Sequence, residues 1–292
     1  MYRRPIVVGV DASDSGRDAL DWAAAEAAAC RLPLCVLHAY STMSSWAMVS
    51  EVPLPYDDAS AAVAAALVEH AAARARCVAS DIEVSTRLVE GTRAPAMLAQ
   101  CRDAELLVIG GRALGGARGM VAGSLGARVA MHADCPVVVV HPMRPLAPGG
   151  SPARVVVGVD GTPSSGRAIE FAVRAAVQRG VDVTAVHAWS PQVVAGLSAS
   201  REAQSGAEAA AWRTFQAVVA QSHLQHRKVR VDLRLVQGPA QDVLVAESAG
   251  AALVVVGSRG RGSVRAALLG SVSRAVLRRA CCPVAVVRSR TS

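Results

Sequence analysis

The same series of short motifs occurs twice along the 292 residues of this chain. The repeated pairs, with the first residue of each, are IVVGVDAS (Ile6) and VVVGVDGT (Val155), LCVLHAY (Leu34) and VTAVHAW (Val183), VEG (Val89) and VQG (Val236), ELLVIGGR (Glu105) and ALVVVGSR (Ala252), and CPVVVV (Cys135) and CPVAVV (Cys282). Such a duplication predicts two domains of one fold, at residues 1–143 and 152–292. The Pro- and Gly-rich stretch PMRPLAPGGSP between them is expected to be a short linker.

Within each copy, short apolar segments rich in β-branched residues alternate with segments of helical periodicity. Asp14 and Thr162 stand at expected helix N-caps, and Pro163 suits a first helical turn. The alternation predicts two tandem α/β domains, each a doubly wound open parallel sheet with helices on both faces. The expected helices are 15–30, 57–79, 93–103 and 123–133 in the first copy, and 164–179, 200–223, 241–249 and 270–280 in the second.

A strand, a glycine-rich loop and a helix start follow one another at residues 254–279, in VVVGSRGRGSVRAALLGSVSRAVLRR. Glycines let the backbone turn its N–H groups toward an anion, and the first turn of a helix offers unpaired N–H groups at its positive end. The spacing of Gly257, Gly260 and Gly270, with Ser271 next, fits G-x2-G-x9-G-[ST]. It predicts a phosphate-binding loop, although a glycine-rich surface connection with a serine cap fits the same spacing.

Polar residues follow the first predicted strand of each copy. In an open α/β sheet, ligands bind beyond the carboxyl ends of the strands, where the strand order reverses. Asp11 and Asp160 follow the first strands, and Ala39 and Ala188 stand at the ends of the second strands. A carboxylate at this place accepts a hydrogen bond from a ribose hydroxyl or caps the next helix, and both roles are compatible with the sequence.

The motifs VVVGVDGT and VHAW, the glycine loop at 257–273 and the closing CPVAVV resemble those of the universal stress protein family, and the two copies cover nearly the whole chain. The resemblance implies a sheet order of 3-2-1-4-5, ATP bound where the first and fourth strands meet, and dimers formed partly through the last strand. In the second copy it implies that Asp160 faces the adenosine, that the backbone at Ala188 holds the adenine edge, and that Gly158 lets the nucleotide lie close to the first strand. The loop residues expected at the nucleotide are Gly257, Ser258, Arg259, Gly260, Arg261, Gly262, Ser263, Gly270, Ser271, Val272 and Ser273.

The first copy departs from this pattern. Ala113 replaces Gly260, which costs about 1 kcal/mol if the position needs a positive φ, and Gly126 replaces Ser273 and removes one hydroxyl. We therefore expect the second copy to bind nucleotide more strongly, and the first to bind weakly or to serve mainly as an interface partner. The corresponding residues of the first copy are Gly9, Asp11, Ala39, Gly110, Gly111, Arg112, Gly115, Gly116, Gly123, Ser124 and Leu125.

The composition indicates which ligands the protein binds and in which compartment it is expected. The formal net charge is +8, almost all of it from arginine, which suits an anionic ligand. Nucleic-acid binding is disfavoured because aromatic residues make up only 3% of the chain and no recognition motif is visible. The seven cysteines include no CxxC pair, so we expect buried thiols in a reducing cytoplasm, with neither a disulfide framework nor a metal site. No signal peptide and no membrane span are expected.

The sequence contains none of the motifs that would predict an enzyme. The glycine loops lack a P-loop lysine, and neither G-x-S-x-G nor H-E-x-x-H occurs, so ATP hydrolysis is expected to be slow or incidental. We expect a regulator in stress response or growth control that binds ATP with Mg, forms a homodimer and contacts an unidentified protein partner. The alternative is an oligomeric scaffold with a vestigial nucleotide site. An adenylyl-transferring enzyme would need an SGG-type or histidine-rich loop, which VGVDAS and VGVDGT lack.

Overall fold

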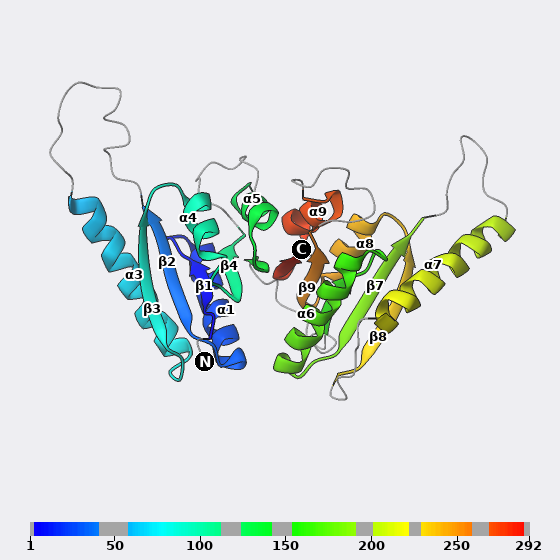
Figure 1. Ribbon diagram of the computed structural model, residues 1–292, viewed down its shortest axis with the longest axis horizontal. Helices are drawn as coiled ribbons and strands as arrows, with labels where there is room; N and C mark the ends of the chain where they lie inside the picture. Colours follow the sequence, from blue (N-terminus) through cyan, green and yellow to red (C-terminus); the bar gives the residue numbers. More distant parts are fainter. Residues whose placement is uncertain are drawn as a thin grey trace, which may run out of the picture. The chain divides into compact units, whose positions relative to one another are not determined.

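The computed structural model divides the chain into two compact units, unit one (Met1–His141) and unit two (Pro142–Ser292) (Figure 1). Each unit is described by itself. The structure describes residues 3–40, 58–111, 124–141, 154–190, 201–221, 229–258 and 269–288.

Unit one is a five-stranded parallel sheet with helices on both faces (Figure 1). Its strands pair in parallel in the order β3-β2-β1-β4-β5. This order confirms the predicted fold class and the 3-2-1-4-5 arrangement. The elements are β1 (Ile6–Gly9), α1 (Asp14–Cys30), β2 (Leu34–Tyr40), α3 (Asp58–Val78), β3 (Val84–Glu90), α4 (Arg93–Gln100), β4 (Leu106–Gly110), α5 (Ser124–His132) and β5 (Val137–Val140).

Unit two repeats this topology. Its strands are parallel in the order β8-β7-β6-β9-β10, which is again 3-2-1-4-5 when numbered within the unit. The elements are β6 (Arg154–Gly158), α6 (Pro163–Arg179), β7 (Val183–Trp189), α7 (Arg201–Gln221), β8 (Val231–Gln237), α8 (Ala240–Glu247), β9 (Ala251–Gly257), α9 (Ser271–Arg279) and β10 (Val284–Val287).

The core is built from Val, Leu and Ala, as the low aromatic content predicts. The central strands are covered on both faces, so consecutive residues such as Leu107 and Val108 of β4 have no exposed surface. Alanines on the inner side of α1, such as Ala23 and Ala27, are also fully buried and let the helix lie close to the sheet. In unit one α1 packs against α3 and α4 against α5, and in unit two α6 packs against α7 and α8 against α9.

The helices begin and end close to the predicted residues, with one correction at a cap. Ser13, and not Asp14, is the N-cap of α1, because the Ser13 hydroxyl accepts a hydrogen bond from the Gly16 N–H at 3.1 Å. Thr162 is the N-cap of α6 and Pro163 lies in its first turn, as predicted. The Thr162 hydroxyl does not cap the helix but donates to Asp160. Within the described ranges, no helix is long and apolar enough to cross a membrane.

The seven cysteines, which all lie in described segments, are free thiols. Four of them are buried as predicted, namely Cys35, Cys101, Cys135 and Cys282. Cys77 is exposed on α3, and Cys30 and Cys281 are half-buried, so the prediction of burial was wrong for these three. Burial raises the pKa of the Cys282 thiol to about 12, which keeps this thiol protonated and unreactive at neutral pH.

The turn that connects the third strand to the next helix requires glycine in both units. Gly91 has φ +126° and Gly238 has φ +141°, in a region that side chains rarely adopt. Their N–H groups donate to the carbonyl oxygens of Tyr40 and Trp189 at 2.8 Å, so each turn is tied to the end of the neighbouring strand. The repeated VEG and VQG motifs therefore encode a backbone conformation.

We expect Gly91→Ala to lower the free energy of unfolding of unit one by about 1–3 kcal/mol, because alanine is strained at this φ. Gly166→Ala in α6 is the matched control: its added Cβ meets nothing within 4 Å, and alanine in a helix is expected to add about 0.5–1 kcal/mol. Urea unfolding monitored by circular dichroism measures the free energy of unfolding of both variants. Equal stabilities of the two variants would contradict the assignment of the turn.

Candidate functional site

The carboxyl ends of β1 and β4 form the point at which the chain order of unit one reverses, and the backbone is packed tightly there. An added Cβ on Gly110, the last residue of β4, would lie 2.5 Å from the carbonyl oxygen of Ser15 in the first turn of α1. Only glycine permits this approach between a strand end and a helix start. Gly110 therefore shapes the floor of the predicted ligand site.

Asp11 uses one carboxylate oxygen to hold the start of α1. Its Oδ1 accepts hydrogen bonds from the Ser13 N–H, at 2.9 Å, and from the Ser13 hydroxyl. Among the described residues, no hydrogen bond reaches Oδ2. Asp11 thus has a structural role at the start of α1, one of the two roles compatible with the sequence. Its second oxygen remains available to a hydrogen-bond donor of a ligand.

Asp160 is held more firmly in unit two. Its Oδ1 accepts from the Thr162 N–H at 3.0 Å, from the Thr162 hydroxyl at 2.7 Å and from the Ser165 hydroxyl at 2.7 Å. The Ser165 oxygen also accepts from the Asp160 N–H at 3.1 Å. Gly16 occupies the corresponding position in unit one, so the third donor is present only in unit two.

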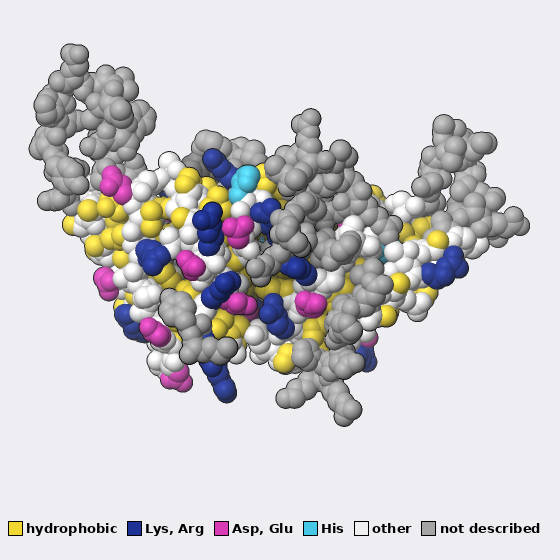
Figure 2. All heavy atoms as spheres, in the orientation of Figure 1, with side chains coloured by type: hydrophobic (Ala, Val, Ile, Leu, Met, Phe, Trp, Pro, Cys, Tyr) yellow, Lys and Arg dark blue, Asp and Glu magenta, His cyan; other side chains and the backbone are white. Residues whose placement is uncertain are grey.

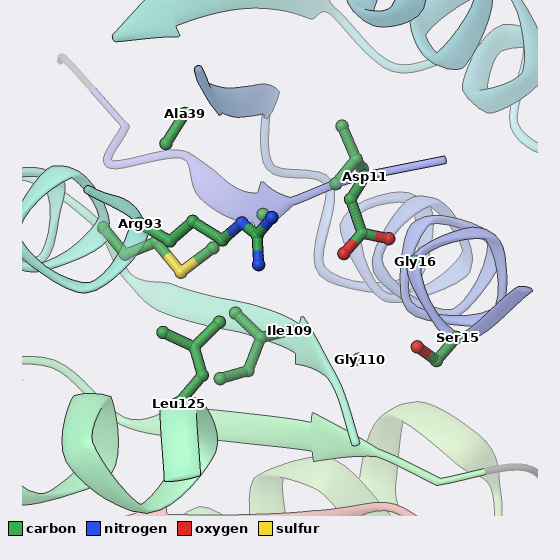
Figure 3. A pocket seen from close by; sticks show the side chains of 11 residues that line it. Asp11, Ser15, Gly16, Ala39, Arg93, Ile109, Gly110 and Leu125 are labelled. Carbon is green, nitrogen blue, oxygen red and sulfur yellow. The ribbon is translucent and has the colours of Figure 1, made fainter. Parts of the chain in front are cut away.

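A pocket lies at the carboxyl edge of the unit one sheet (Figure 3). It is a shallow hollow whose empty space of about 410 Å³ includes open solvent. The predicted residues that the structure brings together there are Gly9, Asp11, Ala39, Gly110 and Leu125. The other residues of its wall, which the sequence did not indicate, are Val10, Ser15, Gly16, Arg93, Met97 and Ile109.

The described part of the unit two site joins the end of β9 to the start of α9. The Ser258 N–H donates to the Val287 carbonyl at 2.9 Å, and the Gly270 N–H donates to the Ser258 carbonyl at 3.0 Å. Gly270 is the N-cap of α9, and no side chain caps this helix. Its first-turn N–H groups therefore lie beside the strand end without a side-chain acceptor, which is the arrangement that binds anions.

A sequence model of the universal stress protein family matches residues 1–141 and 153–288. The chain belongs to the universal stress protein family. A universal stress protein of Mycobacterium tuberculosis H37Rv is 36% identical over 298 residues, covering 97% of this chain and 96% of the relative. One from Mycolicibacterium smegmatis is 31% identical over 297 residues, covering 98% and 97%.

A universal stress protein of Archaeoglobus fulgidus DSM 4304 has a similar crystal structure, with a TM-score of 0.68 and coverage of 98% of this chain and 97% of that one. Its sequence identity is 18%, so this likeness concerns the fold alone.

Ser273 has a structural role in this universal stress protein. Its hydroxyl is buried and donates to the Gly257 carbonyl at 2.6 Å, which ties α9 to the end of β9. The hydroxyl donates its one proton to this carbonyl, and that Ser273 also lies at the phosphates stays a prediction. At Gly126, the corresponding residue of α5, an added Cβ would lie 3.1 Å from Val139, so a side chain there would require Val139 to shift.

The glycines at the ends of β1 and β6 accommodate side chains. A Cβ added to Gly158 would lie 2.8 Å from Leu244 of α8, and one added to Gly9 would lie 2.3 Å from Met97 of α4. We predicted that the lack of a side chain at Gly158 lets a nucleotide lie close to the strand. In the structure, the side chains of Leu244 and Met97 lie against Gly158 and Gly9. That a nucleotide also lies near Gly158 stays a prediction.

Histidines next to Ala39 and Ala188 fix the ends of the second strands. His38 Nδ1 donates to the Val10 carbonyl at 2.8 Å, and His187 Nδ1 donates to the Val159 carbonyl at 2.5 Å. The His187 ring also stacks on Phe215, with centroids 5.7 Å apart. Both histidines are thus hydrogen-bonded to the end of the first strand of their unit, and His187 is also buried. They hold the backbone at Ala39 and Ala188, where the adenine edge is expected.

Most of both glycine loops lies outside the described residues. Of the residues at their edges, Gly111 approaches His141, with an added Cβ 2.6 Å from the ring, while Ser124 and Ser271 begin α5 and α9 and Val272 follows in α9. The predicted residues outside the described ranges are Arg112, Gly115, Gly116, Gly123, Arg259, Gly260, Arg261, Gly262 and Ser263.

Basic and acidic side chains are interspersed over the described surface that Figure 2 shows. Many arginines have acidic partners, such as Arg74 with Asp21 on the outer helices of unit one and Arg279 with Asp242, at 2.8 Å, between α9 and α8. Exposed pairs of this kind contribute little to stability. Within the described residues, no group of three His, Cys, Asp or Glu side chains is placed to hold a metal ion.

We expect Gly16→Ala to destabilise unit one by about 1–3 kcal/mol, because the added Cβ would lie 2.6 Å from Asp11 Oδ1 and 2.9 Å from the Asp11 carbonyl oxygen. Gly206→Ala is the control, since a Cβ at that exposed position of α7 meets nothing within 4 Å. Denaturant unfolding compares the two variants with the wild type. A stable Gly16→Ala variant would show that Asp11 is not held against the first turn of α1.

Proposed function

We propose that this universal stress protein binds ATP, with Mg, at the carboxyl edges of its sheets and acts as a nucleotide-responsive regulator in stress response or growth control. The observation that supports this most strongly is the unit one pocket. Three features meet there, at the switch point of a doubly wound sheet. They are the Asp11 carboxylate, which has one oxygen free, the end of β4 at Gly110, where only glycine fits, and the start of α5.

The contacts suggest how the nucleotide lies. A ribose hydroxyl would donate to the free oxygen of Asp11 or Asp160, and the base would lie along the second strand end, at Ala39 or Ala188. The phosphates would then lie at the N-termini of α5 and α9, where helix N–H groups favour negative charge. The N-cap of α9 is a glycine, so among the described residues no side chain has to be displaced for the first turn to accept a phosphate.

We expect two nucleotide sites of unequal strength. The intact glycine motif favours unit two, and its uncapped α9 beside the β9 end agrees with this choice. The described pocket, however, belongs to unit one, where the strand-end residues Asp11, Ala39 and Gly110 line one hollow despite Ala113 in the loop. Binding without rapid turnover is expected, because the glycine loops lack the lysine of a P-loop.

Homodimer formation and an unidentified protein partner complete the proposal, with the cytoplasm as its compartment. The seven free thiols fit a reducing environment. An oligomeric scaffold with a vestigial nucleotide site is the competing function, and the departures at Ala113 and Gly126 favour it for unit one.

Calorimetric titration of the nucleotide-stripped protein with Mg-ATP is the direct test. We expect binding at one strong site, assigned to unit two, and a weaker site in unit one. Two equal sites would show that Ala113 is tolerated. An absence of binding at millimolar ATP would contradict the proposal and favour the scaffold.

The Gly270→Asp variant tests the phosphate position. Gly270 has φ −59°, which any residue adopts, and aspartate is a favourable N-cap, so the fold is expected to stay intact or become slightly more stable. Its carboxylate would occupy the first-turn N–H groups of α9 and repel phosphates, so we expect ATP binding to unit two to be lost.

Gly206→Asp is the matched control for this variant, since it adds the same charge to an exposed position of α7. Thermal melting reports the fold and calorimetry reports binding. A Gly270→Asp protein that still binds ATP as the wild type does would show that the phosphates do not lie at α9.

A further inference from the structure

Arg93 brings a guanidinium group into the unit one pocket. It is the first residue of α4 and follows the glycine turn at the end of β3. Its side chain extends across the pocket toward Asp11 from the side on which Ala39 lies (Figure 3). Neither the glycine motif nor the strand-end aspartate predicts a cation at this place.

The guanidinium of Arg93 and one oxygen of Asp11 both lack partners within the described residues. No hydrogen bond or ion pair joins Arg93 to any described side chain, in contrast to Arg17, which pairs with Asp14, and Arg74, which pairs with Asp21. Asp11 commits only Oδ1 to Ser13. The pocket thus presents a free donor fork and a free acceptor that are not bonded to each other.

These two groups demand complementary chemistry from one ligand. The Asp11 oxygen needs a donor, which a ribose hydroxyl supplies, and the planar fork of Arg93 needs two acceptors side by side. In a nucleotide whose ribose lies at Asp11, the base faces Ala39 and Arg93. Guanine offers the adjacent acceptors O6 and N7 to an arginine, whereas adenine places an amino donor beside N7.

Unit two differs at this position. Ala240 is the first residue of α8, in the same place after its glycine turn, and has no polar side chain. Both units therefore have the strand-end aspartate, but only unit one has an arginine at the start of the helix after the glycine turn.

We propose that Arg93 reads the base in unit one, so that this unit prefers guanine nucleotides while unit two takes adenine nucleotides. The inference rests on the proposed nucleotide-binding function and specifies the ligand class of one of its sites. Arg93 is a specificity residue here, because the ribose and phosphate contacts are made by other groups.

Calorimetric titration of the full chain carrying Gly270→Asp, with Mg-GTP and with Mg-ATP, isolates unit one. We expect GTP to bind more tightly than ATP, and Arg93→Ala to weaken GTP binding about tenfold or more while changing ATP binding less than about twofold. Arg93→Lys keeps the charge but loses the fork, so it is expected to lose the preference as well. Arg102→Ala, at an exposed arginine outside the pocket, is the control.

The outcomes separate this inference from the proposed function. If unit one binds ATP and GTP equally, or if Arg93→Ala weakens both to the same extent, base reading by Arg93 is overturned and nucleotide binding stands. If neither nucleotide binds to unit one, both proposals fail for that unit. Arg93 is exposed, so its variants are expected to keep the wild-type melting temperature.

The reciprocal substitution, which introduces an arginine into unit two, tests for a gain of GTP binding, a result that misfolding would not produce. In the chain with an intact unit two, Ala240→Arg is expected to raise the affinity of that unit for GTP relative to ATP. A ratio unchanged from the wild type would count against base reading at this position.

Discussion

In each unit, an aspartate at the end of the first strand fixes the turn by which the chain leaves the sheet and enters the next helix. Asp11 and Asp160 bind the N–H and the hydroxyl of the residue two positions on, and so fix the direction in which α1 and α6 begin. Gly110 then allows the first turn of α1 to lie directly against the end of β4. These contacts place the start of α1 next to the ends of β1 and β4, where it forms part of the wall of the unit one pocket.

Hydrophobic periodicity and repetition were enough to predict the fold. Buried strands such as β4 and β9 read as continuous apolar runs, and each lies between segments with a helical pattern, so these patterns predicted an open parallel sheet with helices on both faces. The strand order came from the family resemblance. Caps were less predictable, since Ser13 and Asp14 are both good N-cap residues and the choice depends on which side chain Asp11 engages.

The site was predicted only where a motif or a strand end pointed to it. Asp11, Ala39, Gly110 and Leu125 meet in the pocket, but Arg93 comes from a helix start after β3, which no phosphate-binding motif includes. A systematic comparison of the two copies, setting Arg93 against Ala240, was the signal that would have found it. Ser273 shows the opposite limit, because spacing alone cannot tell a hydroxyl that meets a ligand from one that ties a helix to its strand.

The bond between the Gly270 N–H and the Ser258 carbonyl brings the two ends of a long connection to one point. A segment whose ends are joined in this way contributes little to the position of the strand before it or the helix after it. Substitutions within it are therefore expected to change what the loop binds while β9 and α9 keep their positions. The corresponding connection of unit one has the same length but Ala113 in place of Gly260, so the two copies can differ in what their loops bind while they share one scaffold.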